Sequence, residues 1–321
     1  MTQPATSPVP SAPTPGTLTF TKGHGTQNDF VLIADPEGVL DLGPDDVRRL
    51  ADRRTGIGGD GVIRLAPTAA LARAGEETAQ AALAQDPTAE WFMDYRNADG
   101  SIAEMCGNGV RVFAAFAEQE GLADLSAGPL SLGTRAGVKR VTKEPGGWYA
   151  VDMGPWFLPG GEAAAIEGYD AAVAVRGWTR PRPALSVDLG NPHTVVALAS
   201  VEELVSLELF HAPEVAPLPP HGTNVELVVP LGEEEGPDGV VGRLRMRVHE
   251  RGVGETPSCG TGACAAALAV RTWQGGSSGA GAPDTWIVEV PGGEVRVRVL
   301  PSGNVELAGP AELVYSGQVA R

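Results

Sequence analysis

Hydrophobic and polar positions alternate along much of the chain, and this alternation is interrupted by a few segments of helical character. Beta-branched and aromatic residues flank a Gly/Asn turn in 18–35, which predicts a pair of strands. Segment 43–54 has acids in its first turn and arginines in its last, which suits a helix dipole, and Gly56 can end that helix. Strand character returns at 60–67 and at 91–101, where the strand enters a turn.

Residues 68–90 break this run of strands. They are rich in alanine and polar residues but have no strong apolar stripe, so they predict a surface helix or a poorly ordered insertion, without an assigned function. A helix is expected to start at Cys106 and to run to about Glu120. Two strand regions and a Pro/Gly-rich linker are predicted after it, at 128–143, 147–154 and 155–162.

The second half of the chain repeats this style. A second alanine-rich helix begins at Cys259, and the sequence around it alternates again. Each half therefore consists of several strands around one cysteine-headed helix, which indicates an internal repeat. The other predicted elements are strands in 183–198, 221–230 and 242–256, a short helix at 201–210, and hairpin strands in 286–300 and 303–319.

Composition bounds the class of protein. A chain of 321 residues with 42% hydrophobic residues suggests two domains of roughly 130 to 150 residues each. With 24 basic and 40 acidic residues the net charge is −16, which argues against nucleic acid and anionic membranes as partners. The Pro/Ser/Thr-rich stretch 1–16 predicts a flexible tail and not a signal peptide, and no apolar run is long enough to span a bilayer, so we expect a cytoplasmic protein.

Three cysteines in a chain of this length fit a reducing compartment with free thiols. Cys106 and Cys259 each open a Cys-Gly-x-Gly segment. A helix start offers free N–H groups and partial positive charge, which should lower the thiol pKa, and the glycine lets a ligand approach the backbone. Two such thiols facing each other across a small ligand could remove a proton from one side and return it from the other, which is stereoinversion.

The cysteines could also be packing residues, metal ligands or part of a cofactor enzyme. Packing as a small hydrophobe is favoured for Cys264, which lies among alanines, whereas the duplicated context favours chemistry at the other two cysteines. No zinc motif is present, so no metal is expected. The stretch "GIGGDG" at 56–61 matches a dinucleotide motif by letter but lies in the wrong structural context, and no lysine motif suggests a pyridoxal cofactor. Racemisation without a cofactor is the remaining prediction.

The chain resembles the diaminopimelate epimerase family over about 18–319. The resemblance is carried by "KGHGTQNDFVL", "TGIGGDGVI", "NADGSIAEMCGNGVR", "GNPHTVV", "TNVELV", "HERGVGETPSCGTGACAAALA", "PGGEVRV" and "GPAELVYSG". It implies an α/β (α+β) fold of two pseudo-symmetric domains, each a strand-rich, barrel-like layer around a central helix, with the active site in the cleft between them. The first would comprise 17–154 with 304–321 returning to it, and the second 155–303.

The resemblance also implies the function and the site. The activity would be cofactor-independent epimerisation of LL-2,6-diaminopimelate to the meso form, for lysine and peptidoglycan precursors, and a homodimer is left open. Cys106 and Cys259 would be the two acid–base thiols, exchanging roles with reaction direction. The implied substrate contacts are the asparagines Asn28, Asn97, Asn191 and Asn224, the residues at the two helix starts, Gly107, Asn108, Gly260 and Thr261, and the distal pair Glu250 and Arg251. His193 and Glu250 would also support the activity.

Two departures and two alternatives remain. Gln27 stands where glycine is common in the family, and Gly61 stands where some members carry a glutamine that contacts the substrate. A proline or hydroxyproline racemase is the enzyme alternative, and it would have no use for Glu250 and Arg251 because a cyclic imino acid lacks a second amino acid group. A redox-sensing binding protein, whose two thiols form a disulfide, is the non-enzyme alternative.

Overall fold

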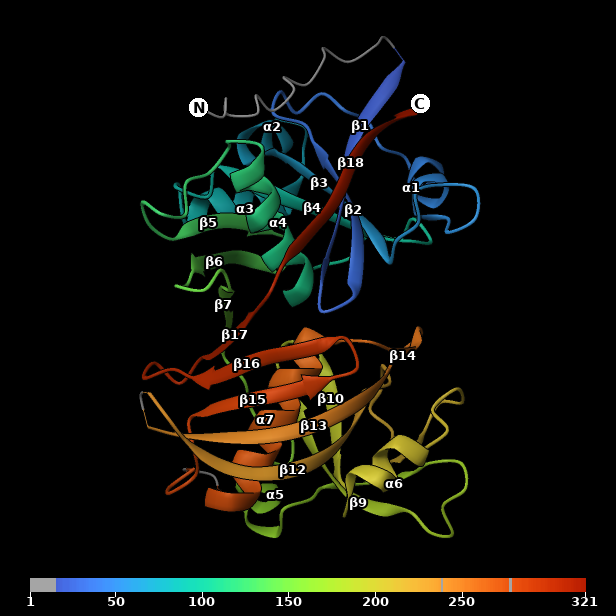
Figure 1. Ribbon diagram of the computed structural model, residues 1–321, viewed down its shortest axis with the longest axis vertical. Coiled ribbons are helices and arrows are strands. Elements are labelled where there is room, and N and C mark those ends of the chain that lie inside the picture. Colours follow the sequence, from blue (N-terminus) through green and yellow to red (C-terminus); the bar gives the residue numbers. More distant parts are fainter. Residues whose placement is uncertain (1–15, 238, 277–278) are drawn as a thin grey trace, which may run out of the picture.

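The computed structural model describes residues 16–237, 239–276 and 279–321, and the chain forms two lobes stacked along its longest axis (Figure 1). Its helices are α1 (Pro44–Ala51), α2 (Thr68–Arg73), α3 (Glu77–Gln85), α4 (Gly107–Gln119), α5 (Gly161–Glu167), α6 (Val201–Ser206) and α7 (Gly260–Gly275). Its strands are β1 (Thr17–Gly25), β2 (Asn28–Ala34), β3 (Gly61–Pro67), β4 (Trp91–Asn97), β5 (Leu130–Thr134), β6 (Gly137–Lys143), β7 (Tyr149–Gly154), β8 (Ala171–Ala174), β9 (Arg182–Asp188), β10 (Pro192–Ala197), β11 (Glu214–Ala216), β12 (Asn224–Gly236), β13 (Gly239–Glu250), β14 (Gly254–Thr256), β15 (Thr285–Val290), β16 (Gly293–Val299), β17 (Val305–Gly309) and β18 (Glu312–Ala320).

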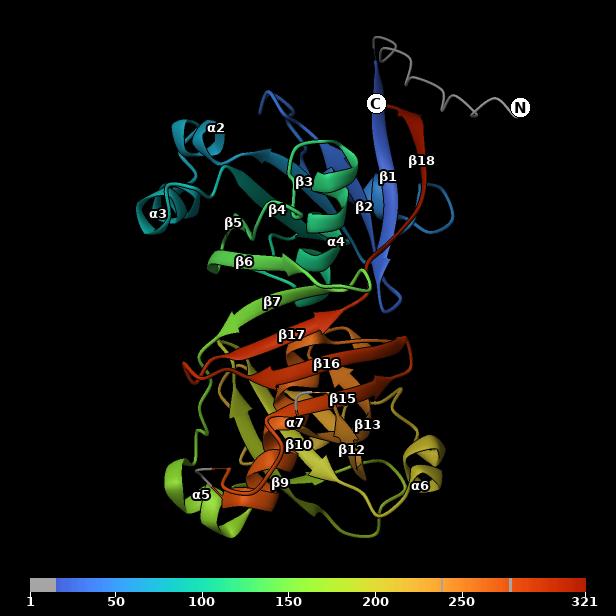
Figure 2. The same ribbon diagram turned by 60° about the vertical axis from the view of Figure 1, so that its left-hand side comes forward.

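The strands form one continuous, open layer. Hydrogen-bonded neighbours follow the order β18, β1, β2, β3, β4, β5, β6, β7, β17, β16, β15, β13, β12, β10, β9, β8 and β11, and β14 pairs with the end of β13. The lobes join where β7 pairs with β17, and Figure 2 shows β6, β7, β17 and β16 as successive rungs across this junction. The layer has two free ends in the described part of the chain, so the predicted barrel-like layer does not close into a barrel.

The predicted internal repeat is visible in the order and direction of the strands. In the first lobe β2 is parallel to β3 and β4 is parallel to β5, and in the second lobe β10 is parallel to β12 and β13 is parallel to β15. Helix α4 comes after β4, and α7 comes after β13 with the short strand β14 between them. The strand that follows each repeat pairs with the first strand of the other repeat. After the first repeat β8 pairs with β9, and after the second repeat β18 pairs with β1. Two pseudo-symmetric, strand-rich α/β lobes are therefore confirmed.

The two central helices lie inside the lobes. Residues 110–117 of α4 and 263–270 of α7 are buried on every side, as expected for helices that are apolar all round. They belong to one apolar core that continues through β7 and β17, to which Met153 and Leu307 contribute. The starts of both helices are thereby held at the junction of the lobes, since β7 and β17 pair there.

Several predicted elements differ in detail. The hairpin strands expected in 286–300 and 303–319 are confirmed for β15, β16 and β17, which pair antiparallel in succession, whereas β18 leaves them and crosses to β1. The linker 155–162 runs into α5, which begins at Gly161. The tail predicted at 1–16 lies outside the described residues except for Gly16, and the domain limits 17–154 and 155–303 stay a prediction.

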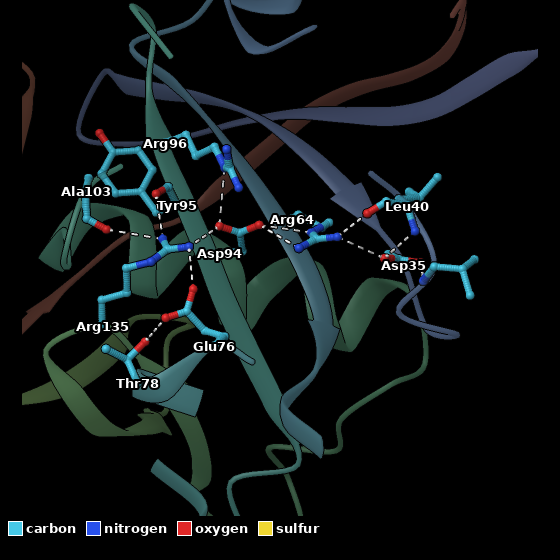
Figure 3. Close-up of polar contacts among 11 residues, drawn as sticks. Asp35, Leu40, Arg64, Glu76, Thr78, Asp94, Tyr95, Arg96, Ala103 and Arg135 are labelled. Carbon is cyan, nitrogen blue, oxygen red and sulfur yellow. Dashed lines mark hydrogen bonds and ion pairs between the residues drawn. The ribbon is translucent and has the colours of Figure 1, made fainter. Parts of the chain in front are cut away.

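The insertion at 68–90 is ordered. It forms α2 and α3, which lie on the outer side of the first lobe (Figure 2), with Ala79 and Ala82 fully buried. Figure 3 shows how its polar side chains continue into the sheet: Glu76 lies 3.5 Å from Arg135, which pairs at 2.6 Å with the buried Asp94. The surface-helix alternative is therefore the correct one. No helix in the described ranges is both long and apolar enough to cross a membrane.

Candidate active site

The two cysteines of the repeated segments cap the two central helices. Cys106 is the N-cap of α4, and its sulfur accepts a hydrogen bond from the Gly109 N–H at 3.5 Å. Cys259 is the N-cap of α7 and accepts from the Gly262 N–H at 3.3 Å. Both thiols are free, and Cys259 is the more buried. Cys264 is fully buried within α7, which confirms its prediction as a core residue.

The two helix starts adjoin each other. A Cβ built on Gly107 or on Gly260 would lie 3.0 or 2.9 Å from the same atom, Cδ2 of Leu307. A side chain at either position would require the Leu307 side chain to move, which favours the glycine after each cysteine. The buried Asn108 joins the two segments directly, because its Nδ2 donates to the carbonyl and the hydroxyl of Ser258, both at 3.2 Å. Its amide therefore belongs to the wall of the site.

The ionisation of the thiols differs from the expectation. Burial raises the pKa of the Cys106 thiol to about 11 and raises that of Cys259 well above its ordinary value. The N–H groups of Gly109 and Gly262 act in the opposite direction but are outweighed, and the negative charge of Glu250 raises the pKa of both thiols further. The prediction of a low pKa from the helix start alone is wrong in this arrangement, because desolvation is the larger effect.

Asn28 is brought to the first thiol. It begins β2, and its Oδ1 accepts from the Cys106 thiol at 3.4 Å and from Asn108 Nδ2 at 3.3 Å. Its own Nδ2 donates to Asp60 Oδ2 at 2.7 Å. Asp60 is part of the "GIGGDG" stretch, so that stretch serves to orient an asparagine beside a thiol.

A second chain of polar contacts leads away from the other thiol. The Thr261 hydroxyl lies 3.5 Å from the Cys259 sulfur and accepts from Asn191 Nδ2 at 3.2 Å. Asn191 Oδ1 lies 3.2 Å from Nε2 of His193, whose Nδ1 lies 2.7 Å from Glu226 Oε1. Both His193 and Glu226 are buried, and Glu226 Oε2 has no hydrogen-bond partner among the described residues.

Three further expected residues meet at the ends of β12 and β13. Asn224 begins β12, donates to the Pro192 carbonyl at 3.2 Å and accepts from the Arg251 N–H at 3.0 Å. Glu250 ends β13, accepts from the Thr256 hydroxyl, and has its pKa raised by burial. The Arg251 side chain is exposed, and its guanidinium donates to the His221 carbonyl at 2.7 Å. The backbone of Arg251 therefore contacts Asn224, whereas its guanidinium contacts the loop that contains His221.

Asn97 and Gly61 lie opposite each other at the ends of β4 and β3, and Gln27 lies in the β1–β2 turn. Asn97 ends β4 in register with Gly61, and its Nδ2 donates to the Ser101 hydroxyl at 3.0 Å. A Cβ on Gly61 would lie 2.4 Å from the Arg96 carbonyl oxygen, so a glutamine contact is excluded there by the backbone. Gln27 has a φ of 65° in the β1–β2 turn, a conformation that glycine adopts more easily.

The repeat places the expected residues in corresponding positions. Phe30 pairs with Gly61 across β2 and β3 as His193 pairs with Asn224 across β10 and β12. Asn28 and Asn191 both lie two residues before the first member of these pairs. Asn97 and Glu250 both end a strand nine residues before the cysteine of their repeat. The two thiols therefore have corresponding surroundings, except that the amide of Asn97 in the first repeat corresponds to the carboxylate of Glu250 in the second.

Four polar residues escaped the sequence interpretation: Asp60, Arg111, Glu226 and Ser258. Each forms a hydrogen bond with a residue that the sequence did predict. Only Asp60 and Ser258 could have been found from the sequence, because they lie within or next to a glycine-rich motif. Among the described residues no group of three or more His, Cys, Asp or Glu side chains is arranged to hold a metal ion.

Comparisons with known proteins agree with this geometry. The family model described as diaminopimelate epimerase matches residues 20–158 and 185–314. The chain is 44% identical over 304 residues to the diaminopimelate epimerase of Streptomyces coelicolor, covering 94% of this chain and 95% of that protein. It is 45% identical over 306 residues to that of Thermobifida fusca, covering 94% of this chain and 98% of that protein.

Solved structures of distant proteins share the fold. A PhzF-family phenazine biosynthesis protein from Bacillus anthracis matches with a TM-score of 0.59 at 14% identity, covering 94% of this chain and 99% of that one. A hydroxyproline epimerase from Agrobacterium vitis matches with a TM-score of 0.56 at 15% identity, covering 95% of this chain and 93% of that one. At such identities the likeness concerns the fold, whereas the sequence matches concern the family. The chain belongs to the diaminopimelate epimerase family.

Proposed function

We propose that this protein is an isomerase that converts LL-2,6-diaminopimelate to the meso form without a cofactor, with Cys106 and Cys259 as the acid–base pair. The observation that carries the proposal is the meeting of two cysteine-capped helix starts at Leu307 and at the Asn108–Ser258 contact. The names of the curated relatives support the same substrate.

The reaction needs one thiolate and one thiol. The thiolate removes the proton from the α-carbon and becomes a thiol, while the electron pair stays on the substrate and is delocalised into its carboxylate. The remaining N–H groups in the first turns of α4 and α7, together with the positive ends of the two helices, would stabilise that charge. The opposite thiol then donates its proton to the other face of the carbon and becomes the thiolate, so the enzyme carries the same number of protons before and after.

The elevated thiol pKa values give substrate binding a role in activation. With both thiols held in a buried site, the thiolate is disfavoured until positive charge enters. The α-ammonium group of the substrate brings such charge. In this proposal Asn28, Asn97, Asn191, Asn224, Glu250, Arg251 and the cradle formed by Gly107, Asn108, Gly260 and Thr261 bind the substrate, and His193 supports the Cys259 side through Asn191 and Thr261.

The experiment is solvent isotope exchange. Reduced protein is incubated with LL-diaminopimelate in deuterated water, and the product should be the meso form with deuterium on one α-carbon. The absence of exchange in the parent protein refutes the proposal. Proline and trans-4-hydroxyproline serve as matched substrates, and exchange on these alone would favour the alternative racemase, whereas ligand binding with disulfide formation and no exchange would favour the redox-sensing protein.

Single substitutions test the pair of thiols. Cys106→Ala and Cys259→Ala should each abolish epimerisation, because either variant lacks one of the two proton carriers. Cys264→Ala is the matched control: it removes a buried thiol from the same helix as Cys259 and should leave epimerisation at the parent rate. Full activity in either of the first two variants contradicts the two-base scheme.

The proposal also covers the setting of the enzyme: the cytoplasm, lysine and peptidoglycan precursor synthesis, and assembly as a homodimer. The dimer is supported by β18, which pairs with β1 along one edge only and exposes Val314 and Tyr315, at 57% and 49%. An exposed strand edge is a template for pairing with a second copy. Light scattering of the parent and of Tyr315→Lys would measure the loss of that dimer.

A further inference from the structure

Arg111 is a buried cation without a carboxylate partner. It lies on α4 five residues after Cys106 and is completely buried. All of its hydrogen bonds in the described structure go to uncharged oxygens: Asn108 Oδ1 at 2.8 Å, the Pro310 carbonyl at 3.3 Å, and the Gly107 carbonyl and Thr26 hydroxyl at 3.4 Å. Burying an unpaired charge costs several kcal/mol, so its presence calls for a compensating benefit.

The surroundings are shaped to admit this guanidinium. A Cβ on Gly25 would lie 3.1 Å from Arg111 Nη2, and a Cβ on Gly309 would lie 3.3 Å from its Cζ. Gly25 ends β1 and Gly309 ends β17, so two strands that are far apart in sequence leave space for the same group. The Arg111 side chain is therefore packed closely at the junction of the lobes, where two glycines leave space for it.

The repeat shows that this charge occurs once. The position five residues after Cys259 is Cys264, so the second helix carries a small thiol where the first carries the arginine. Arg111 acts electrostatically on the Cys106 thiol, at the start of α4, and on the Cys264 thiol, inside α7. Its positive charge therefore favours the thiolate at the first helix start, and its link to the second start runs through Asn108 and Thr26.

The contacts of Asn108 carry the effect to both cysteine segments. Arg111 holds Asn108 Oδ1, which turns Nδ2 toward Asn28 Oδ1 beside Cys106 and toward Ser258, the residue before Cys259. Thr26 closes the loop, since its hydroxyl accepts from Arg111 and lies 2.7 Å from the Ser258 hydroxyl. Without the guanidinium the Asn108 amide can rotate and release both contacts.

We propose that Arg111 is a positioning residue for the reaction, which locks Asn108 between the two cysteine segments and supplies positive charge behind the start of α4. The inference rests on the proposed function for its kinetic test. The negative charge that it faces is that of the thiolate, together with the substrate carboxylate held at the same N–H groups. Glu250, which also acts on Cys106, has the opposite effect on the thiolate.

The kinetic test compares Arg111→Met, which keeps the length of the side chain, with Lys139→Met as a matched control. Lys139 is another buried cation, which donates to the Met153 carbonyl at 3.0 Å and touches neither cysteine segment. We expect Arg111→Met to lower kcat about 100-fold while KM stays within about threefold, because Asn191, Asn224 and Glu250 still bind the substrate. Lys139→Met should keep the parent kcat.

A retained kcat in folded Arg111→Met overturns the inference. If that variant does not fold, Arg111→Lys carries the test, because it keeps the charge but has one nitrogen in place of the three that bond Asn108, Gly107 and Pro310. A kcat lowered about tenfold in Arg111→Lys supports the inference, and the parent kcat in that variant refutes it.

A second readout needs no substrate. The rate of alkylation of Cys106 by iodoacetamide, followed on the Cys106 peptide by mass spectrometry, should fall about tenfold in Arg111→Met because less thiolate is present. An unchanged rate contradicts the electrostatic part of the inference. If the parent protein itself exchanges no α-proton, the proposed function fails, and this alkylation rate still decides the role of Arg111.

Discussion

Asn28 owes its orientation to Asp60, and Asp60→Asn tests that dependence with the smallest change of shape. Asp60 Oδ2 accepts from Asn28 Nδ2 at 2.7 Å and from the Asp29 N–H at 3.1 Å, while Oδ1 accepts from Arg53 at 2.7 Å. An amide at position 60 has only one oxygen, so its NH2 group must face a donor on one of these two sides. The contact to Asn28 is then lost or competes with the ion pair.

The size of the effect follows from the exposure of the carboxylate. A hydrogen bond to a charged group contributes about 1.5–3 kcal/mol. The Asp60 side chain is 39% exposed, so water replaces part of the lost contact and we expect the free energy of unfolding to fall by about 1 kcal/mol. At the site, a freed Asn28 no longer holds the Cys106 thiol and Asn108, and a loss of about 1.4 kcal/mol there corresponds to a tenfold fall in kcat/KM.

The assay is the kcat/KM of α-proton exchange with LL-diaminopimelate, measured beside thermal unfolding. Asp52→Asn is the matched control, because Asp52 is an aspartate of the same loop that accepts from Arg54 and Thr55 and has no contact with Asn28. It should keep the parent kcat/KM. If Asp60→Asn also kept it, Asn28 would not depend on the carboxylate, and the reasoning about the "GIGGDG" stretch would be refuted.

Three further predictions concern the same site. Glu226→Gln should lower kcat about tenfold, because His193 loses a charged partner at 2.7 Å; a normal kcat in the folded variant contradicts this. Gly61→Ala should cost about 3 kcal/mol of unfolding free energy in a denaturant titration, since its Cβ would lie 2.4 Å from the Arg96 carbonyl oxygen, and an unchanged midpoint refutes the clash. Because burial raises the pKa of Cys106 to about 11, kcat/KM should rise as the pH is raised from neutrality toward 9, and a flat profile would show that the thiolate is already formed.

The periodicity of the sequence was sufficient for most elements of the fold. Alternation and turn residues located the strands, and the alanine-rich stretches after Cys106 and Cys259 located the two central helices. The pairing of β18 with β1 and of β7 with β17 is decided by contacts between segments that are far apart, so local patterns could not reveal that the layer stays open.

For the site, the sequence indicated the residues better than their energetics. The approach of a ligand to the glycine after each cysteine stays a prediction, and the structure adds that Cδ2 of Leu307 lies close to both glycines. The thiol pKa was predicted with the wrong sign, because a helix start is a local feature, whereas desolvation depends on everything that packs around the sulfur. Arg111 gave no signal for a related reason: a single arginine in an apolar helix becomes informative only when its burial is known.

Glu250 offers a test in which two consequences have opposite signs. Its charge raises the pKa of both Cys106 and Cys259, whereas the corresponding position in the first repeat holds the uncharged Asn97. Glu250→Gln should therefore increase the alkylation rate of both thiols, since more thiolate is present at a given pH. Epimerisation should nevertheless fall, because the substrate loses its anionic contact. Glu255→Gln, which removes an exposed carboxylate of the same hairpin, should change neither rate. A parallel fall of alkylation and epimerisation in Glu250→Gln would mean that Glu250 maintains the shape of the site, and that its charge does not set the reactivity of the thiols.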